Sequence, residues 1–81
     1  MEIYFSRHAQ RRLKLYAIDA DDVVSSIHSW FGKQSIIQNR NSIIVNELEN
    51  KYQFPLKIIF AFEGSTVTVI TAYPLKKGKH V

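Results

Sequence analysis

The 81-residue chain contains no cysteine, only two prolines and three glycines, and no long apolar run. Without cysteine it cannot form a disulfide bond, and zinc or iron–sulfur sites built from thiolates are excluded. The longest apolar run, Ile58–Phe62, has five residues, whereas a helix needs about 20 to cross a bilayer. The N-terminus lacks the basic flank and apolar stretch of a signal peptide. We therefore predict a protein that is neither exported nor integral to a membrane, and the absence of cysteine fits a cytoplasmic location.

Apolar residues make up 46% of the chain and aromatic residues 12%, which is the composition of a folded protein. The length is that of one small domain, so we predict a single domain over residues 1–81. A core of this size requires most of the apolar side chains. We therefore look for functional residues among the polar and charged ones.

The net charge of +4 is unevenly distributed along the chain. Residues 1–16 and residues 57–81 each carry +3, whereas residues 17–28 carry −3. The acidic segment contains three aspartates, Asp19, Asp21 and Asp22. Carboxylates at these positions suit the first turn of a helix, where they interact favourably with the helix dipole. The two basic ends attract phosphate groups, although an ordinary solvated surface also explains such clusters.

The N-terminal third of the chain predicts a short strand and two helices. Glu2–Phe5 is apolar and aromatic, as in a brief strand, and Ser6 is a suitable N-cap for a helix over Arg7–Tyr16. Asp19 is a suitable N-cap for a second helix that ends at about Ser29. The first helix has a predicted core stripe at helical spacing, made of Ala9, Leu13 and Tyr16. Its neighbouring face is formed by His8, Arg11, Arg12 and Leu15.

Apolar residues around the second helix are also assigned to packing. Ile18 and Val23 can contact each other across the N-cap, and we assign Trp30 and Phe31 to the core or to the helix end. His28 is expected near the end of this helix.

The rest of the chain predicts strands. Ser42–Glu47 and Thr66–Tyr73 are rich in β-branched residues, and Phe54–Phe62 is an apolar run whose early proline suits an edge or the start of a strand. Glu63–Ser65 predicts a hairpin turn, Pro74 ends the last strand, and Ser35–Gln38 is a weaker strand candidate. We therefore predict an α+β fold in which two N-terminal helices pack on one face of an antiparallel sheet of three or four strands.

Common catalytic motifs are absent, including the phosphate-binding and dinucleotide-binding glycine loops and the zinc-binding HExxH pattern. We predict no cofactor and no bound metal. The remaining polar residues suit RNA cleavage without a metal, which needs a base, an acid and cations that balance the phosphate charge. Histidine can transfer the protons near neutral pH, arginine matches the phosphate, and tyrosine can stack on a base or donate a hydrogen bond. Each of these residue types also has a purely structural explanation. The histidine and the arginines can belong to a solvated surface, the tyrosine can cover a sheet edge, and the residues at the chain end can be disordered.

Two stretches of the sequence resemble a known family. The segment Phe5–Arg12 (FSRHAQRR) and the closing segment Val67–Tyr73 (VTVITAY) are similar to short RelE-like domains of the RelE/ParE toxin superfamily. These domains open with an S-x-H-A-x-x-R helix and close with a strand rich in valine and threonine that ends in tyrosine. Cations are few in the predicted strands, since Arg40 precedes them and Lys57 lies inside one.

The resemblance implies the toxin of a type II toxin–antitoxin module, an endoribonuclease that cleaves mRNA, including ribosome-bound mRNA, and is held inactive by a cognate antitoxin protein. The predicted catalytic residues are His8, Arg11 and Tyr73. The predicted RNA-binding residues are Arg7, Arg12, Lys76, Lys77, Lys79 and His80. The alternatives are a basic module that binds RNA or protein without catalysis, and a small structural domain whose basic surface has no ligand.

Overall fold

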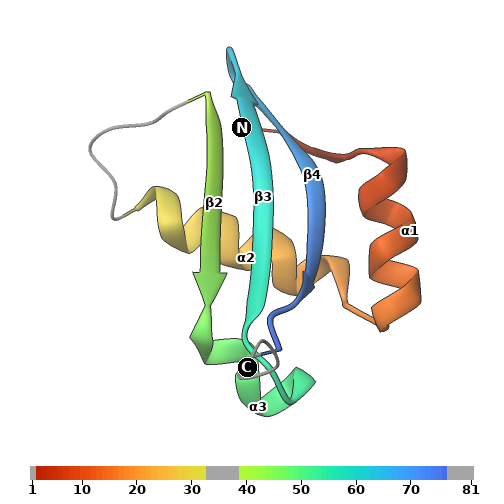
Figure 1. Cartoon of the computed structure of the whole chain (residues 1–81). Coiled ribbons are helices and arrows are strands. Elements are labelled where there is room, and N and C mark those ends of the chain that lie inside the picture. The colour runs from red at the N-terminus through yellow and green to blue at the C-terminus, as the bar shows by residue number, and fades with distance from the viewer. Residues whose placement is uncertain (1, 33–38, 77–81) are drawn as a thin grey trace.

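In the computed structural model, which describes residues 2–32 and 39–76, one strand and two helices are followed by three further strands. A short helical segment separates the second strand from the third (Figure 1). The elements are β1 (Glu2–Phe5), α1 (Arg7–Tyr16), α2 (Ala20–Phe31), β2 (Arg40–Val45), the 3₁₀ helix η1 (Asn46–Leu48), α3 (Glu49–Tyr52), β3 (Leu56–Glu63) and β4 (Thr66–Pro74).

The four strands form one sheet in the order β1–β4–β3–β2. The strands β2, β3 and β4 are antiparallel neighbours, but β1 runs parallel to β4, with Ile3 opposite Val67. The α+β class is confirmed, whereas the prediction of an antiparallel sheet is wrong for β1. Parallel neighbours need a long connection, and the chain from α1 to β3 supplies it. The sequence does not reveal which edge the short first strand joins.

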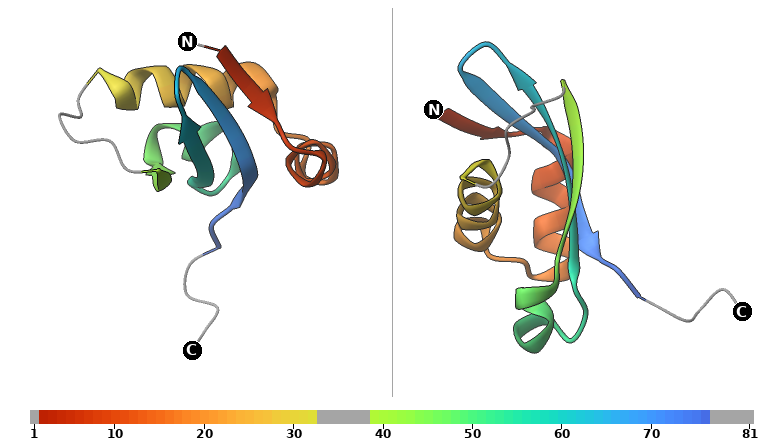
Figure 2. Two further views of the ribbon diagram at one scale, coloured as in Figure 1. Left: turned by 90° about the horizontal axis from the view of Figure 1, so that it is seen from above. Right: turned by 90° about the vertical axis from the view of Figure 1, so that its left-hand side faces the viewer.

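The core lies between α2 and one face of the sheet, while the helix α1 lies beside β4 (Figures 1 and 2). The strand β1 pairs with Thr66–Val69 of β4, and α1 lies beside the rest of β4. Trp30 and Phe31 pack against the core as predicted, and the Trp30 ring meets the Phe60 ring edge-on at 5.2 Å. The fully buried members of the core include Val23 and Ile27 of α2, Leu56, Ile58 and Phe60 of β3, and Val67, Val69 and Ala72 of β4.

The start of α1 agrees with its prediction, but one of its predicted core residues does not. The Ser6 side chain accepts a hydrogen bond from Ala9 N at 3.0 Å, which confirms the N-cap. Ala9 is buried and Leu13 packs against the core, whereas Tyr16 is 37% exposed. The prediction for Tyr16 is wrong because this residue lies in the last turn of α1, just before Ala17 ends the helix with a left-handed φ of 54°.

The second N-cap is also confirmed, since the Asp19 side chain accepts a hydrogen bond from Asp21 N at 3.0 Å. The helix α2 extends to Phe31, two residues beyond the prediction, because Trp30 and Phe31 pack on the sheet. The predicted strand Ser42–Glu47 instead spans Arg40–Val45, and the strand predicted from Phe54 begins at Leu56. The predicted strand Ser35–Gln38 lies outside the described residues.

The short helix α3 was not predicted and is held in place by tertiary contacts. The Tyr52 hydroxyl donates a hydrogen bond to the Asp22 carboxylate at 2.5 Å and accepts one from Asp19 N at 3.0 Å. The Lys51 ammonium forms an ion pair with the same carboxylate at 2.7 Å. A helix of four residues is unstable alone, so these contacts with the start of α2 determine its position. Among the described residues, no helix has the length and apolar character required to cross a membrane.

Candidate nucleic-acid interface

The face of the sheet opposite α2 is not covered by any helix in the described part of the chain (Figures 1 and 2). In β3, Leu56, Ile58 and Phe60 are buried, so the intervening Lys57 and Ile59 are turned to the other side. We call this surface the outer face. It is formed by Glu2 and Tyr4 of β1, Thr66, Thr68, Thr71 and Tyr73 of β4, Lys57, Ile59, Ala61 and Glu63 of β3, and Arg40, Ser42 and Ile44 of β2.

A bulge in β4 places Tyr73 on the outer face. Val67 and Val69 are buried, and regular alternation would put Thr71 and Tyr73 on the same buried side. The register shifts instead, since Ile59 pairs with Thr71 while Phe60 pairs with Val69, which leaves Ile70 as an extra residue. A shift of one residue reverses the face of every later side chain. Ala72 is therefore buried and Tyr73 lies on the outer face, opposite Lys57.

The residue Ser6 connects this bulge to the start of α1. Its backbone N–H donates to the carbonyl oxygen of Val69 at 3.0 Å, and its hydroxyl donates to the carbonyl oxygen of Ile70 at 3.0 Å. The same hydroxyl oxygen caps α1. One side chain therefore ties the first turn of α1 to the position at which β4 changes face.

On α1, His8 and Arg12 interact directly. Arg12 Nε donates a hydrogen bond to His8 Nε2 at 3.3 Å, so this imidazole nitrogen is the acceptor of the pair. Successive helical residues are rotated by about 100°. Because Leu13 packs against the core on the side of α2, His8 and Arg12 lie on the opposite flank of the Ala9 stripe. That flank faces the same way as the outer face.

The other predicted site residues are divided between two sides of the molecule. Arg7 and Arg11 are exposed on the side of α1 that points away from the sheet, opposite the buried Ala9. Lys76 follows β4, with its Nζ atom 5.9 Å from the centroid of the Phe54 ring. The chain leaves the sheet there on the side opposite α2 (Figure 2). Three predicted residues, Lys77, Lys79 and His80, lie outside the described residues.

The structure therefore brings His8, Arg12, Tyr73 and Lys76 to one side of the molecule. It adds Lys57, for which the sequence predicted no role. The position of Lys57 between Leu56 and Ile58 is the pattern that indicates its exposure, because alternate residues of a strand point to opposite faces. Arg40 of β2 is a further cation of the outer face, opposite Ala61.

The carboxylates of this side lie at the other end of the sheet. Glu63 precedes the hairpin turn, and Glu2 lies near it, since its backbone N–H approaches the carbonyl oxygen of Ser65 at 3.4 Å. The Tyr4 hydroxyl donates to Glu2 Oε1 at 2.5 Å, and this bond raises the pKa of Tyr4. Lys57 and Lys76 therefore lie away from these carboxylates, whereas Arg40, opposite Ala61, lies nearer to Glu63. In residues 2–32 and 39–76, no group of three His, Asp or Glu side chains is arranged to hold a metal ion.

The chain matches no known protein-family model, and no curated protein or solved structure is significantly similar to it. The similarity to RelE-like domains stays a prediction from the two sequence segments that carry it. The function of the chain is therefore inferred from its own residues and fold.

Proposed function

We propose that this protein binds RNA on the outer face and cleaves it, acting in the cytoplasm as the toxin of a type II toxin–antitoxin module. One observation carries the proposal. The bulge at Ile70 turns Tyr73 to the outer face beside Lys57, on the side to which the His8–Arg12 pair of α1 also points. A histidine, an arginine, a lysine and a tyrosine from α1, β3 and β4 thus border one open surface.

RNA binding follows from the charge and the aromatic groups of this surface. The Lys57 ammonium and the Arg12 guanidinium neutralise phosphates, and each neutralised phosphate releases counterions. The Tyr73 ring offers a face on which an unpaired base can stack. A sheet without a helical cover leaves room for a single strand.

Cleavage uses the same side chains in distinct roles. On binding, the Arg12 guanidinium moves from His8 to the scissile phosphate, which frees the lone pair of His8 Nε2. This nitrogen removes the proton of the ribose 2′-hydroxyl, and the 2′-oxygen attacks phosphorus while the bond to the 5′-oxygen breaks. Arg12 stabilises the developing charge, and the Tyr73 hydroxyl donates a proton to the departing oxygen. Arg11 was predicted to be catalytic, but it is turned away from this surface and is given no role in the proposed step.

The alternative is a basic module that binds RNA without cleaving it. One observation favours this alternative, namely that the lone pair of His8 Nε2 already accepts a hydrogen bond from Arg12. If Arg12 stays in place when RNA binds, no base is available at this position.

Purified protein incubated with mixed-sequence single-stranded RNA, with and without ribosomes, distinguishes these functions when RNA ends and RNA affinity are both measured. We expect new RNA ends that disappear in His8→Gln and Tyr73→Phe while the affinity for RNA is retained. Lys14→Gln, at an exposed residue of α1 that is turned away from the outer face and has no predicted role, is the matched control and should cleave normally. Binding without cleavage supports the alternative. The absence of binding, together with normal growth of bacteria that express the chain without its neighbouring gene, rules out both.

A further inference from the structure

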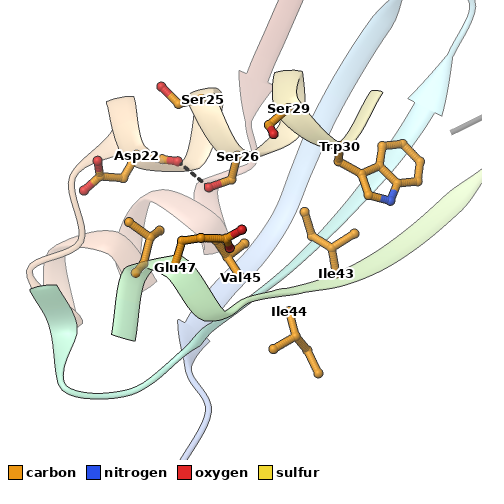
Figure 3. Close-up of a pocket in the computed structure, with 10 residues that line it drawn as sticks. Asp22, Ser25, Ser26, Ser29, Trp30, Ile43, Ile44, Val45 and Glu47 are labelled. Atoms are coloured by element: carbon orange, nitrogen blue, oxygen red, sulfur yellow. Dashed lines mark hydrogen bonds between the residues drawn. The ribbon is translucent and has the colours of Figure 1, made fainter. Parts of the chain in front are cut away.

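A cleft of about 340 Å³ lies between α2 and β2, on the side of the sheet opposite the outer face. Its apolar lining comes from Ile43, Val45 and Leu48 together with the ring of Trp30, as Figure 3 shows for the labelled residues. The serines of α2 line its other side. The cleft borders Ile44, which is 51% exposed. An open groove with one apolar wall and one polar wall therefore lies beside the edge strand β2.

The strand β2 forms an edge of the sheet, and the hydrogen-bonding pattern shows which of its groups are free to pair. Phe62 N donates to Asn39 O at 2.7 Å, in register with the pairing of Asn41 with Phe60. In an antiparallel ladder, alternate residues direct their backbone groups to the partner strand. The backbone groups of Arg40, Ser42 and Ile44 therefore point away from β3, and no described strand pairs with them.

Within the described residues, this edge shows none of the usual protection against pairing. Edge strands are commonly shielded by lysine, proline, bulges or a covering loop. From Ser42 to Val45 the edge is uncharged and contains no proline, and the register of β2 with β3 is regular. A strand that paired with this edge would place its alternate side chains directly over Ile43 and Val45 in the cleft.

The charge of the cleft indicates what such a strand would carry. The lining contains two carboxylates, Asp22 and Glu47, and no lysine or arginine. Asp22 is already bound by Lys51, whereas Glu47 has no ion pair within the described residues. In a chain with a net charge of +4, Glu47 therefore gives the cleft a local negative charge that no described residue balances.

We propose that the free edge of β2 and the α2–β2 cleft together bind an extended, basic segment of a partner protein. The segment adds to the sheet as a fifth strand, with apolar side chains over Ile43 and Val45 and a lysine or arginine at Glu47. Main-chain hydrogen bonds supply affinity in this mode of recognition, and the side-chain pockets supply specificity. The inference does not rest on RNA cleavage, because none of the proposed catalytic residues lines the cleft or belongs to β2.

The test uses the peptide KTVTVTK, blocked at both ends, and the fluorescence of Trp30, the only tryptophan of the chain. The peptide reads the same in both directions, so in either direction of pairing the face with its two valines also carries both lysines, one of which lies at the Glu47 end. We expect saturable binding that changes Trp30 emission and protects the Ser42 and Ile44 amides from hydrogen exchange. The matched peptide ETVTVTE should bind at least about tenfold more weakly. Glu47→Gln should remove most of the difference between the two peptides, because it removes the charge that distinguishes them.

Ser42→Pro tests the edge itself, since it removes an outward N–H and leaves the pairing with β3 intact. It should weaken peptide binding at least about tenfold relative to Ser42→Ala. If Ser42→Pro does not fold, two N-methylated peptides make the same test on the unaltered protein, one methylated at the odd-numbered residues and one at the even-numbered residues. The peptide whose methyl groups replace the N–H groups that face β2 should bind more weakly. Equal binding by all variants and peptides would overturn the proposal. It would also be overturned if the chain alone forms a dimer that Ser42→Pro dissociates, because the occupant of the edge is then a second copy.

Discussion

The hydroxyl of Ser6 donates a hydrogen bond to the carbonyl oxygen of Ile70, the extra residue of the β4 bulge, across 64 positions of sequence. The same oxygen accepts the Ala9 N–H at the start of α1. The cap of the first helix and the bulge that turns Tyr73 outward therefore share one side chain. The stability of α1 and the geometry of the outer face are consequently linked.

Replacing Ser6 by alanine removes both hydrogen bonds. We expect a loss of about 1–2 kcal/mol in the free energy of unfolding, because α1 loses its N-cap and the carbonyl oxygen of Ile70 loses its hydrogen-bond donor. Urea denaturation measures the change. The exposed Ser25 of α2 is the matched control, and Ser25→Ala should alter stability by less than about 0.5 kcal/mol. Equal effects of the two substitutions would show that Ser6 does not link α1 to β4.

Lys57→Gln should weaken the binding of single-stranded RNA and reduce its dependence on salt. One lost phosphate contact lowers the slope of log affinity against log salt by about 0.7 for a single strand. Lys14→Gln, on an exposed residue of α1 turned away from the outer face, should leave the slope unchanged. Titrations at several salt concentrations measure both. If Lys14 rather than Lys57 changes the slope, RNA binds elsewhere than on the outer face.

The contact between Asp22 and α3 makes stability depend on pH. Hydrogen bonds from Lys51 and Tyr52 lower the pKa of Asp22 below its usual value of 3.8. A carboxyl group whose pKa is lower in the folded state stabilises the fold above its usual pKa, and the effect is lost as pH falls through the lowered value. Asp22→Asn should therefore lower Tm at pH 7, and its difference from the unaltered chain should shrink below about pH 4. Asp21→Asn, outside this contact, is the control for the thermal scans. If the difference in Tm between Asp22→Asn and the unaltered chain persisted at pH 2, it would contradict the lowered pKa of Asp22.

The burial of one sheet face and the exposure of the other predict unequal effects of two isoleucine truncations. Ile58 is fully buried, whereas Ile44 is 51% exposed. Ile58→Ala should cost about 2–5 kcal/mol, since it leaves a cavity in the core. Ile44→Ala should cost less than about 1 kcal/mol, as is usual for surface positions. Chemical denaturation of the two variants gives the comparison, and similar losses would mean that the outer face is covered in solution.

Ala17→Gly should stabilise the chain. Ala17 ends α1 with a left-handed φ of 54°, which is unfavourable for residues with a Cβ atom but not for glycine. We expect a gain of up to about 1 kcal/mol, reduced by the greater freedom of glycine in the unfolded chain. Ala20→Gly, at the start of α2, is the control and should destabilise. A loss of stability in Ala17→Gly, measured by thermal unfolding, would contradict this interpretation.

The features that the sequence predicted correctly depend on local interactions. Ser6 and Asp19 cap helices because their side chains reach backbone N–H groups only two or three residues away. The Glu63–Ser65 turn and the end of β4 at Pro74 follow from residue types with restricted or unusual backbone conformations. His8, Arg12, Tyr73 and Lys76 were selected by residue type, and all four lie on the side of the outer face. Their roles in RNA binding and cleavage stay predictions.

The remaining features depend on contacts between distant segments. Hydrogen bonding between β1 and β4 makes the sheet mixed, and Tyr52 with Lys51 holds α3 against α2. The alternating sequence of β4 predicts that Val67, Val69 and Tyr73 share one face. The extra residue Ile70, bound by Ser6, reverses that alternation and brings Tyr73 to Lys57. The sequence by itself therefore determined which side chains are available for chemistry, whereas only tertiary pairing, through a shift of one residue, decided which of them meet on one surface.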